Sequence, residues 1–585
     1  MEIIKRDGKI EQFDKNKIIN AVSMAFIEVD GELLDNSKKK AIEIADYVQS
    51  LDSKLSVEEI QDIVENKLMA SSRKDVARAY IKYRYKRNIE REKKTQFIKD
   101  VSEKILASNL QNQNANVDEA SFGGRAGEAR DELMKKYALD YIVSEKSKNN
   151  HNNNEIYIHD LSSYAIGEHN CLSIPFDDLL KNGFNTRQTD VRPAQSINTA
   201  FQLLAVVFQL QSLQQFGGVS ATHLDWTMVP YVRKSFYKHF IEGLKYIEGI
   251  EYERKDEELS IESEEYTYYN RVYKYAMEKT KKELSQAVEG MFHNLNTLQS
   301  RSGNQLPFTS INFGTCTLPE GRMVIKALLE GSIKGVGKFH KTAVFPCSIF
   351  QCMKGVNREP GDPNYDLFKL ALKSTSQRLY PNYVNVDWSV NEGYDINDPK
   401  TYTSTMGCRT YNGYDINAEE GVNPQTKDGR GNICPVTIIM PTLAMKAKEE
   451  NKENLVETFM NILDLKIDEA KDMLIERYEW ICKQNPSSAR FMYENGLMLG
   501  YDGKNIESAM KHGTLALGQL GLAETLQVLI GKDHTEPEGL ELAKRIEKLF
   551  NTKCKEFKNK YKLNFGVYYT PKCKNKSSVG ASIAI

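Results

Sequence analysis

The sequence predicts an α/β protein that can close into a barrel, preceded by a small and mostly helical unit. Three observations support this prediction. Short apolar runs typical of strands alternate with helical stretches in the second half of the chain, as they do in α/β folds. These runs are apolar along their length, as expected for strands buried on both faces. Residues 1–92 instead contain helical patterns after one short hairpin.

The amino-acid composition excludes several classes of protein. The 585 residues carry 79 basic and 80 acidic side chains, so no overall charge marks a nucleic-acid or membrane binder. The start is too polar for a signal peptide, and the most apolar run, residues 201–213, is too short to span a bilayer. Nine cysteines without a C-x-x-C pair predict neither a disulfide framework nor a metal site. We therefore expect a cytoplasmic protein.

The first predicted unit covers residues 1–92. Residues 3–13 match a hairpin that turns at Asp7-Gly8, a pair that readily accommodates positive φ. Helical patterns follow at residues 18–26, 37–51, 56–69 and 74–91. Basic residues gather near the first helix and could hold a triphosphate through charge-assisted bonds, although a solvated basic face is the commoner origin of such a cluster.

This N-terminal pattern, from Lys5-Arg6-Asp7-Gly8 to Phe13 and Lys17, resembles an ATP-cone domain. That family senses ATP against dATP at the head of ribonucleotide reductases. By position, the residues that match its nucleotide-contacting region are Lys5, Arg6, Glu11 and Lys17. The resemblance therefore implies ATP and dATP as allosteric effectors.

A polar linker with one or two helices is predicted over residues 93–154, followed by one large domain over residues 155–571 and an atypical tail over residues 572–585. Strands of the large domain are predicted at residues 156–161, 307–314, 343–346, 433–440 and 565–571. Helices are predicted at residues 194–216, 323–334, 365–379, 454–484, 505–511, 522–529 and 537–550.

The helix predicted over residues 194–216 carries an uncharged polar stripe on an otherwise apolar surface. Asn198 and Gln202 belong to this stripe, together with Gln195 and Gln209. Such a face can meet another surface through hydrogen bonds, either at a subunit interface or at a nucleotide base. A partly exposed helix explains the pattern equally well.

One cysteine stands out by its setting. Cys408 lies in the run of small and hydroxylated residues 403–410, between Gly407 and Arg409. Gly407 permits a tight turn and the close approach of another group, so this run can present one sulfur at a loop tip. Taken alone, the cysteine is explained as well by packing as a small buried hydrophobe.

The ordered set of motifs resembles the large subunit of the anaerobic (class III) ribonucleoside-triphosphate reductase over nearly the whole chain. The similarity rests on residues 157–160, 170–171, 307–314, 344–346, 406–409, 429–432, 521–524 and 568–571. It implies a ten-stranded α/β barrel of the glycyl-radical enzyme and ribonucleotide reductase type, with a cysteine on a central finger loop that Cys408 matches. It also implies a homodimer and a radical-SAM activating enzyme as partner.

The resemblance further implies how ribonucleoside triphosphates are reduced. A thiyl radical at Cys408 abstracts the ribose 3′ hydrogen, and Cys171 donates hydrogen from the opposite face as the 2′ hydroxyl leaves as water. Formate then reduces the intermediate, Asn432 is a candidate to orient substrate or formate, and His159 to contact substrate. The nearby Cys434 leaves a second alternative, in which a thiol acts as the reductant in place of formate. The triphosphate could rest on a helix N-terminus, for which the segment after Pro441-Thr442 is one candidate.

The chain departs from this family at its end. The family continues into a zinc-binding region with two C-x-x-C pairs and a glycyl-radical loop of the form Arg-Val-x-Gly-Tyr, and residues 572–585 resemble neither. Gly580 lacks the neighbours expected of the radical glycine. We interpret the chain as a truncated or split reductase, able to bind nucleotides but not to turn over without its radical domain.

Two other classes of function share parts of this pattern. A non-catalytic nucleotide-sensing or dimerising remnant would also keep the cone and the barrel. A glycyl-radical enzyme of the pyruvate formate-lyase kind would be expected to carry adjacent cysteines at the finger loop, whereas Cys408 stands alone. The paired thiols Cys408 and Cys171 argue against a long-decayed remnant, whereas the missing family tail argues for one.

Overall fold

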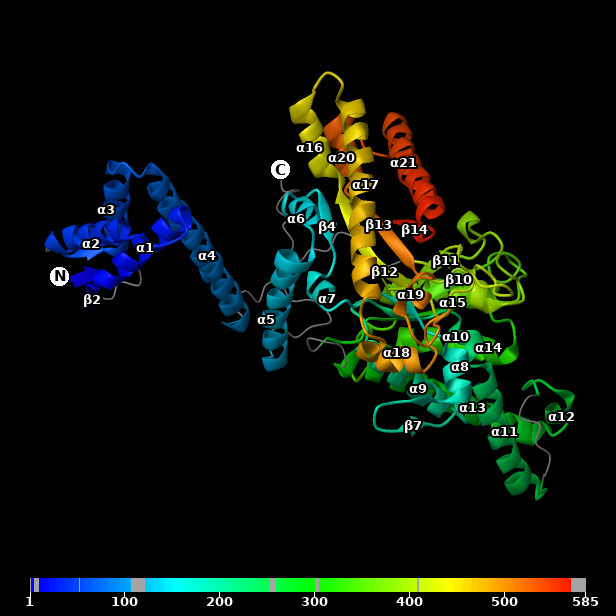
Figure 1. The fold of residues 1–585 in the computed structure, drawn as a ribbon. Coiled ribbons are helices and arrows are strands. Elements are labelled where there is room, and N and C mark those ends of the chain that lie inside the picture. The colour runs from blue at the N-terminus through cyan, green and yellow to red at the C-terminus, as the bar shows by residue number, and fades with distance from the viewer. Residues whose placement is uncertain are drawn as a thin grey trace. The chain divides into compact units, whose positions relative to one another are not determined.

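The computed structural model describes residues 2–4, 10–51, 53–106, 121–251, 259–299, 305–407 and 410–569. The chain divides into two compact units, Met1–Glu103 and Lys104–Ile585. Figure 1 shows their elements: helices dominate the first unit, and strands alternate with helices in the second. The predicted α/β class with a helical N-terminal unit is confirmed. No helix among these residues is long and apolar enough to cross a membrane.

The first unit combines a small sheet with helices. Strand β1 (Glu2–Ile4) pairs antiparallel with β2 (Ile10–Gln12) and parallel with β3 (Leu55–Ser56). The predicted turn at Asp7-Gly8 lies outside the described residues. The helices are α1 (Lys15–Asp30), α2 (Asp35–Ser50), α3 (Val57–Ala70) and α4 (Lys74–Leu106), so the last of these runs beyond its predicted end at residue 91.

Local capping explains where these helices begin. The Asp14 side chain accepts a hydrogen bond from the Asn16 N–H at the start of α1. Ser56 and Glu59 form a reciprocal capping box at the start of α3. The apolar faces of the helices pack around Val22 and Val48, both fully buried, so this unit has a hydrophobic core of its own.

Two sheets frame the second unit. One has the order β11-β10-β9-β8-β5, with every pair parallel, and the other has the order β14-β13-β12-β4, in which only β4 is antiparallel. The strands are β4 (Ile156–Ile158), β5 (Leu172–Ser173), β8 (Val219–Ala221), β9 (Thr309–Phe313), β10 (Cys347–Cys352), β11 (Asn382–Asn385), β12 (Asn432–Ile439), β13 (Thr514–Leu520) and β14 (Asn564–Tyr569). A separate hairpin joins β6 (Phe184–Asn185) to β7 (Asp190–Val191).

The two sheets meet where β5 lies beside the start of β12. The Asn170 and Cys171 N–H groups donate to the Ile433 and Asn432 carbonyls at 2.8 and 2.9 Å, in an antiparallel register. This contact, which we call the sheet joint, makes one strand array that ends at β11 on one side and β14 on the other within the described part of the chain. Closure into a ten-stranded barrel remains a prediction.

Helices connect the parallel strands and pack on the sheets (Figure 1). α17 and α21 lie against β12, β13 and β14, and their apolar faces join the main core. The helices of this unit are α5 (Phe122–Tyr137), α6 (Glu145–Asn152), α7 (Leu161–Ala165), α8 (Phe176–Asn182), α9 (Ile197–Gln211), α10 (Leu224–Thr227), α11 (Val229–Gly243), α12 (Glu264–Thr267), α13 (Asn270–Thr297), α14 (Pro319–Lys334), α15 (Tyr365–Arg378), α16 (Met440–Glu450), α17 (Leu455–Cys482), α18 (Arg490–Glu494), α19 (Ile506–Met510), α20 (Leu522–Ile530) and α21 (Pro537–Tyr561).

One predicted strand is wrong. Residues 343–346 precede β10, which begins only at Cys347. The Val344 and Phe345 N–H groups donate to the Asn296 side chain at 2.8 and 3.0 Å instead of to a neighbouring strand. Pro346 has no N–H to donate, so this segment cannot join the ladder along its length.

Candidate active site

The loop predicted to carry the reactive thiol is held on both sides of Cys408. Cys408 and Arg409 themselves lie outside the described residues. The Met406 N–H donates to the Thr410 carbonyl at 2.9 Å, and Thr405 pairs with Tyr411 in an antiparallel bridge. The chain therefore returns at Thr410 close to the point where it leaves Met406.

Polar side chains of neighbouring strands hold the segment that leads to this loop. Asn312 on β9 donates to the Thr405 carbonyl and accepts from the Thr405 N–H, both at 3.0 Å. Gln351 on β10 donates to the Thr403 carbonyl at 3.0 Å. Both side chains are fully buried. The segment thus crosses the face of the five-stranded sheet, held by two buried amides, of which Asn312 both donates and accepts.

Replacing Asn312 with leucine is expected to lower turnover more than it lowers stability. The substitution leaves the Thr405 N–H and carbonyl without these partners, at a cost of about 3 kcal/mol. Asn357→Leu is the matched control, because Asn357 is equally buried but does not contact residues 403–405, which lead to Cys408 and which we call the finger segment. Asn357 donates instead to the Gly314 and Gln351 carbonyls. Melting temperatures should fall similarly in both variants. Equal losses of turnover would contradict a positioning role for Asn312.

Cys171 and Asn432, both predicted to be catalytic, meet at the sheet joint. The Cys171 thiol is 1% exposed, donates to the Asn170 side-chain oxygen at 3.2 Å and accepts the Gly218 N–H at 3.3 Å. Gly431 lets the two backbones approach this closely, since a Cβ there would stand 1.7 Å from the Cys171 carbonyl oxygen. The structure therefore brings two predicted site residues together from distant parts of the sequence.

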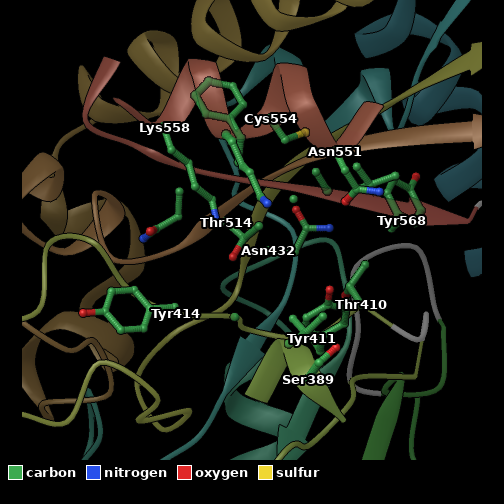
Figure 2. A pocket seen from close by; sticks show the side chains of 18 residues that line it. Ser389, Thr410, Tyr411, Tyr414, Asn432, Thr514, Asn551, Cys554, Lys558 and Tyr568 are labelled. Atoms are coloured by element: carbon green, nitrogen blue, oxygen red, sulfur yellow. The ribbon is translucent and has the colours of Figure 1, made fainter. Parts of the chain in front are cut away.

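A cavity of about 410 Å³ opens beside Asn432 (Figure 2). Thr410, two residues after Cys408, lines the same cavity, and so does Tyr568 on β14. Asn432 is 1% exposed, yet neither atom of its side-chain amide has a hydrogen-bond partner within the described residues. Because buried polar groups are nearly always paired, this amide is suited to hydrogen-bond a ligand in the cavity. The volume falls in the range of small-molecule sites.

His159 is linked to this cavity through Tyr568. Its Nε2 atom lies 2.7 Å from the Thr437 hydroxyl and 3.0 Å from the Tyr568 hydroxyl. Arg477 donates to the His159 carbonyl at 2.6 Å and packs between the Tyr164 and Phe216 rings. Burial and the charge of Arg477 lower the pKa of His159 to about 3. The imidazole is therefore neutral at physiological pH.

His159 should make the fold sensitive to acid. Unfolded histidine has a pKa of about 6.5, so below that pH the unfolded chain binds a proton that folded His159 rejects. The resulting loss of stability is absent above pH 6.5, grows as the pH falls, and reaches up to about 2 kcal/mol at pH 5. His159→Gln should therefore show a smaller fall in melting temperature between pH 7 and pH 5. His534→Gln, at an exposed position, is the control and should behave as wild type.

The remaining predicted site residues are distributed over both units, and Asn198, Gln202 and Cys434 are not among the described residues that line the cavity. Glu11 and Lys17 are exposed in the first unit, while Lys5 and Arg6 lie outside the described residues. Asn198 and Gln202 are exposed on α9, so this part of the predicted polar stripe faces outward, whereas Gln209 is only partly exposed and its side-chain nitrogen is buried. Cys434 is buried and donates to the Leu474 carbonyl of α17 at 3.7 Å, away from the cavity wall.

Several functional candidates were not predicted from the sequence. Lys555, Lys558 and Cys554 of α21 line the cavity, as does Thr514 of β13. Asn312 lies within a motif that supported the family resemblance, but its contact with the finger segment was not foreseen. An amide within a strand that is expected to be buried on both faces is the one sequence signal that could have singled it out.

Comparison with solved structures identifies the class of fold. The anaerobic ribonucleotide reductase from Thermotoga maritima with citrate in the active site aligns with a TM-score of 0.55 at 15% identity, covering 78% of this chain and 76% of that one. The T. maritima enzyme in complex with dATP and CTP aligns with a TM-score of 0.53 at 14% identity, covering 76% and 69%. The fold is thus that of an anaerobic ribonucleotide reductase.

Sequence comparison then assigns the family. Residues 113–574 match the family model of the anaerobic ribonucleoside-triphosphate reductase, and residues 1–89 match the ATP cone domain. The Haemophilus influenzae anaerobic ribonucleoside-triphosphate reductase is 31% identical over 91% of this chain and 71% of its own length. The Escherichia coli relative is 30% identical over 97% of this chain and 76% of its own. The chain belongs to the anaerobic ribonucleoside-triphosphate reductase family, and the resemblance inferred from its motifs is confirmed.

Proposed function

We propose that the chain reduces ribonucleoside triphosphates to deoxyribonucleoside triphosphates by anaerobic radical chemistry, with formate as reductant. One observation carries the proposal. Thr410 and Asn432 line one cavity, and Cys171 is bonded through its backbone to Asn432. A sugar in this cavity would therefore lie beside the loop that carries Cys408 and beside Asn432, to whose backbone Cys171 is bonded, although Cys171 itself is not among the described lining residues.

The roles follow from the chemistry that each side chain can perform. A thiyl radical at Cys408 takes the 3′ hydrogen, and the Cys171 thiol donates a hydrogen as the 2′ hydroxyl departs as water. The unpartnered amide of Asn432 orients the substrate or formate through hydrogen bonds. Neutral His159 acts through Tyr568, whose hydroxyl lies 3.0 Å from the His159 ring and which lines the cavity. Formate supplies the remaining electrons and leaves as carbon dioxide.

The radical must reach Cys408 from a glycyl radical, which we propose is held by a radical domain acting with this chain and installed by a radical-SAM activating enzyme. The family's zinc would belong with that domain. Across the residues that the structure describes, no group of three histidine, cysteine or carboxylate side chains could hold a metal ion.

Regulation is assigned to the first unit. We propose that it binds ATP or dATP through Lys5, Arg6, Glu11 and Lys17, in line with the match to the ATP cone domain. The exposed stripe with Asn198 and Gln202 is proposed as a homodimer or effector surface.

Two further cysteines, Cys434 and Cys554, are candidates for a thiol reductant that would replace formate. Burial raises the pKa of Cys434 to about 12, and its thiol bonds to α17, which argues against a redox role. Cys554 lines the cavity, and burial raises its pKa to about 12 as well. Cys554 is therefore the thiol whose removal distinguishes the two reductants.

The test is an anaerobic assay of the chain with an activated radical domain from a relative, CTP and ¹³C-formate. We expect dCTP and ¹³CO₂ in equal amounts, also from Cys554→Ser. Product without ¹³CO₂ that disappears in Cys554→Ser would replace formate by a thiol reductant. ATP binding to the chain without any dCTP would instead favour the nucleotide-sensing remnant.

A further inference from the structure

The substrate cavity carries positive charge that no protein carboxylate balances. Lys555 and Lys558 of α21 line it, and the described lining residues include no aspartate or glutamate. Lys558 is partly buried, and Figure 2 shows its side chain directed into the cavity toward Thr514. Nearly every buried or partly buried charge in a protein has a partner, so this one calls for an anion.

Several other cations on the same helix have carboxylate partners. Lys544 and Arg545 pair with Glu541 and Glu457, and Lys553 lies 3.0 Å from Asp468. In contrast, Lys555 and Lys558 form no ion pair with any described residue. The exposed Lys548 and Lys560 also form no ion pair with any described residue, so Lys558 is distinguished by being partly buried against the cavity while it lacks a carboxylate partner.

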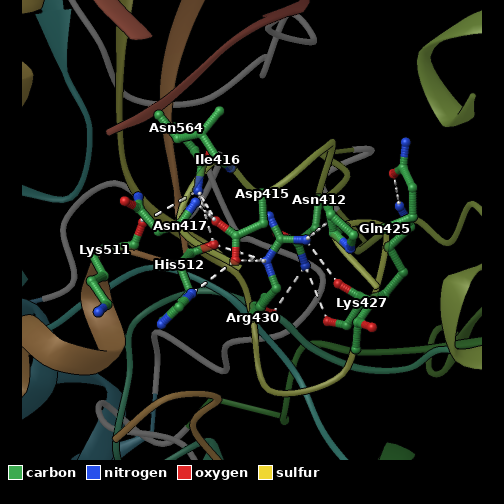
Figure 3. Close-up of polar contacts among 12 residues, drawn as sticks. Asn412, Asp415, Ile416, Asn417, Gln425, Lys427, Arg430, Lys511, His512 and Asn564 are labelled. Atoms are coloured by element: carbon green, nitrogen blue, oxygen red, sulfur yellow. Dashed lines mark hydrogen bonds and ion pairs between the residues drawn. The ribbon is translucent and has the colours of Figure 1, made fainter. Parts of the chain in front are cut away.

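The charge of the buried Arg430 also acts on Lys558. Arg430 is 1% exposed, and its guanidinium donates to the His512 and Thr426 carbonyls while Asp415 lies 3.8 Å away (Figure 3). Burial and the charges of Arg430 and Lys555 lower the pKa of Lys558. An anion in the cavity would offset this repulsion.

The position of Lys558 relative to the sheet decides which anion fits. Asn432, Thr514 and Asn564 are register partners on β12, β13 and β14, so they form one row across the cavity wall. Lys558 points at this row. If the ribose lies against Asn432, the groups next to Lys558 are those attached to the sugar, and the anionic ones are the 5′ phosphates.

We propose that Lys558, assisted by Lys555, forms the phosphate subsite of the cavity and binds the triphosphate of the ribonucleotide whose ribose lies at Asn432. The inference rests on the proposed function for the identity of the nucleotide. It differs from the helix N-terminus predicted at Pro441-Thr442, since neither of those residues is among the described lining residues. Lysine serves this role as a compact charge with three donors.

The subsite can be tested by site-resolved lysine acetylation of the full chain, read by mass spectrometry, which needs no radical and is not confused by nucleotide bound elsewhere. Excess CTP is expected to slow acetylation of Lys558 at least about fivefold, whereas cytidine and formate leave it unchanged. Lys548, exposed on the same helix and outside the cavity, is the internal control and should react equally in all samples.

Two results would overturn the subsite: unchanged acetylation of Lys558 at saturating CTP, or equal protection by cytidine. Protection by formate but not CTP would assign the lysine to a small carboxylate instead and also contradict the proposal. In the activated assay, Lys558→Met should raise the KM for CTP about tenfold with a smaller change in kcat, while Lys548→Met should not. Protection by CTP without any turnover would leave the subsite standing and reject only the proposed reaction.

Discussion

Cys408→Ala and Cys171→Ser should each reduce anaerobic dCTP formation at least about a thousandfold while nucleotide binding persists. Alanine at position 408 has no atom that can carry the radical. Serine at position 171 can still accept the Gly218 N–H, which now bonds to the thiol at 3.3 Å, so the fold should remain. Its O–H bond is too strong to give up a hydrogen atom in the same step.

The control for these variants is Cys482→Ser. Cys482 is a half-buried thiol at the end of α17 and does not line the cavity. Its replacement should leave dCTP formation within about twofold of wild type. Substantial product from either Cys408→Ala or Cys171→Ser, measured at equal protein concentration, would remove that thiol from the mechanism.

Gly431→Ala should be among the most destabilising single substitutions in the chain. A methyl group at this position would stand 1.7 Å from the Cys171 carbonyl oxygen, and the atom in its way belongs to the backbone. The strands of the sheet joint would have to separate, at a cost of about 3 kcal/mol or more. We expect a lower melting temperature by calorimetry and the loss of dCTP formation together.

Gly290→Ala supplies the matched control. Gly290 is exposed on α13, and a Cβ there would meet no atom within 4 Å. Alanine favours helix over glycine by up to about 1 kcal/mol, so this variant should melt at the same temperature or slightly higher. A Gly431→Ala protein that melts and turns over like wild type would show that the sheet joint is looser than described.

Local signals predicted the helix starts well. Asp14 and Ser56 cap α1 and α3, and a capping side chain acts on its own first turn, so the sequence suffices to find it. The end of α21 was missed because the apolar stripe continues past Phe550 through Cys554 and Phe557 among many lysines. The strand expected at residues 343–346 failed because a distant side chain, Asn296, takes its N–H groups.

The candidate site, too, was predicted from the sequence only in part. Family motifs pointed to Cys171 and Asn432, but their backbone pairing depends on the meeting of two sheets, which no local pattern encodes. Lys558 was overlooked because a lysine on a charged helix is ordinarily solvated, and its setting depends on what the helix faces. Long-range packing therefore decides which polar residues become functional.

The central claim is that Cys408 and Cys171 face one another across the nucleotide site, and chemical cross-linking tests it most directly. The full chain would be treated anaerobically with a short bifunctional thiol reagent, and cross-linked peptides would be identified by mass spectrometry with and without CTP. We predict one dominant cross-link joining Cys408 to Cys171, suppressed by CTP. A dominant cross-link from Cys408 to Cys434 or Cys554, or one that CTP does not affect, would contradict the proposed site.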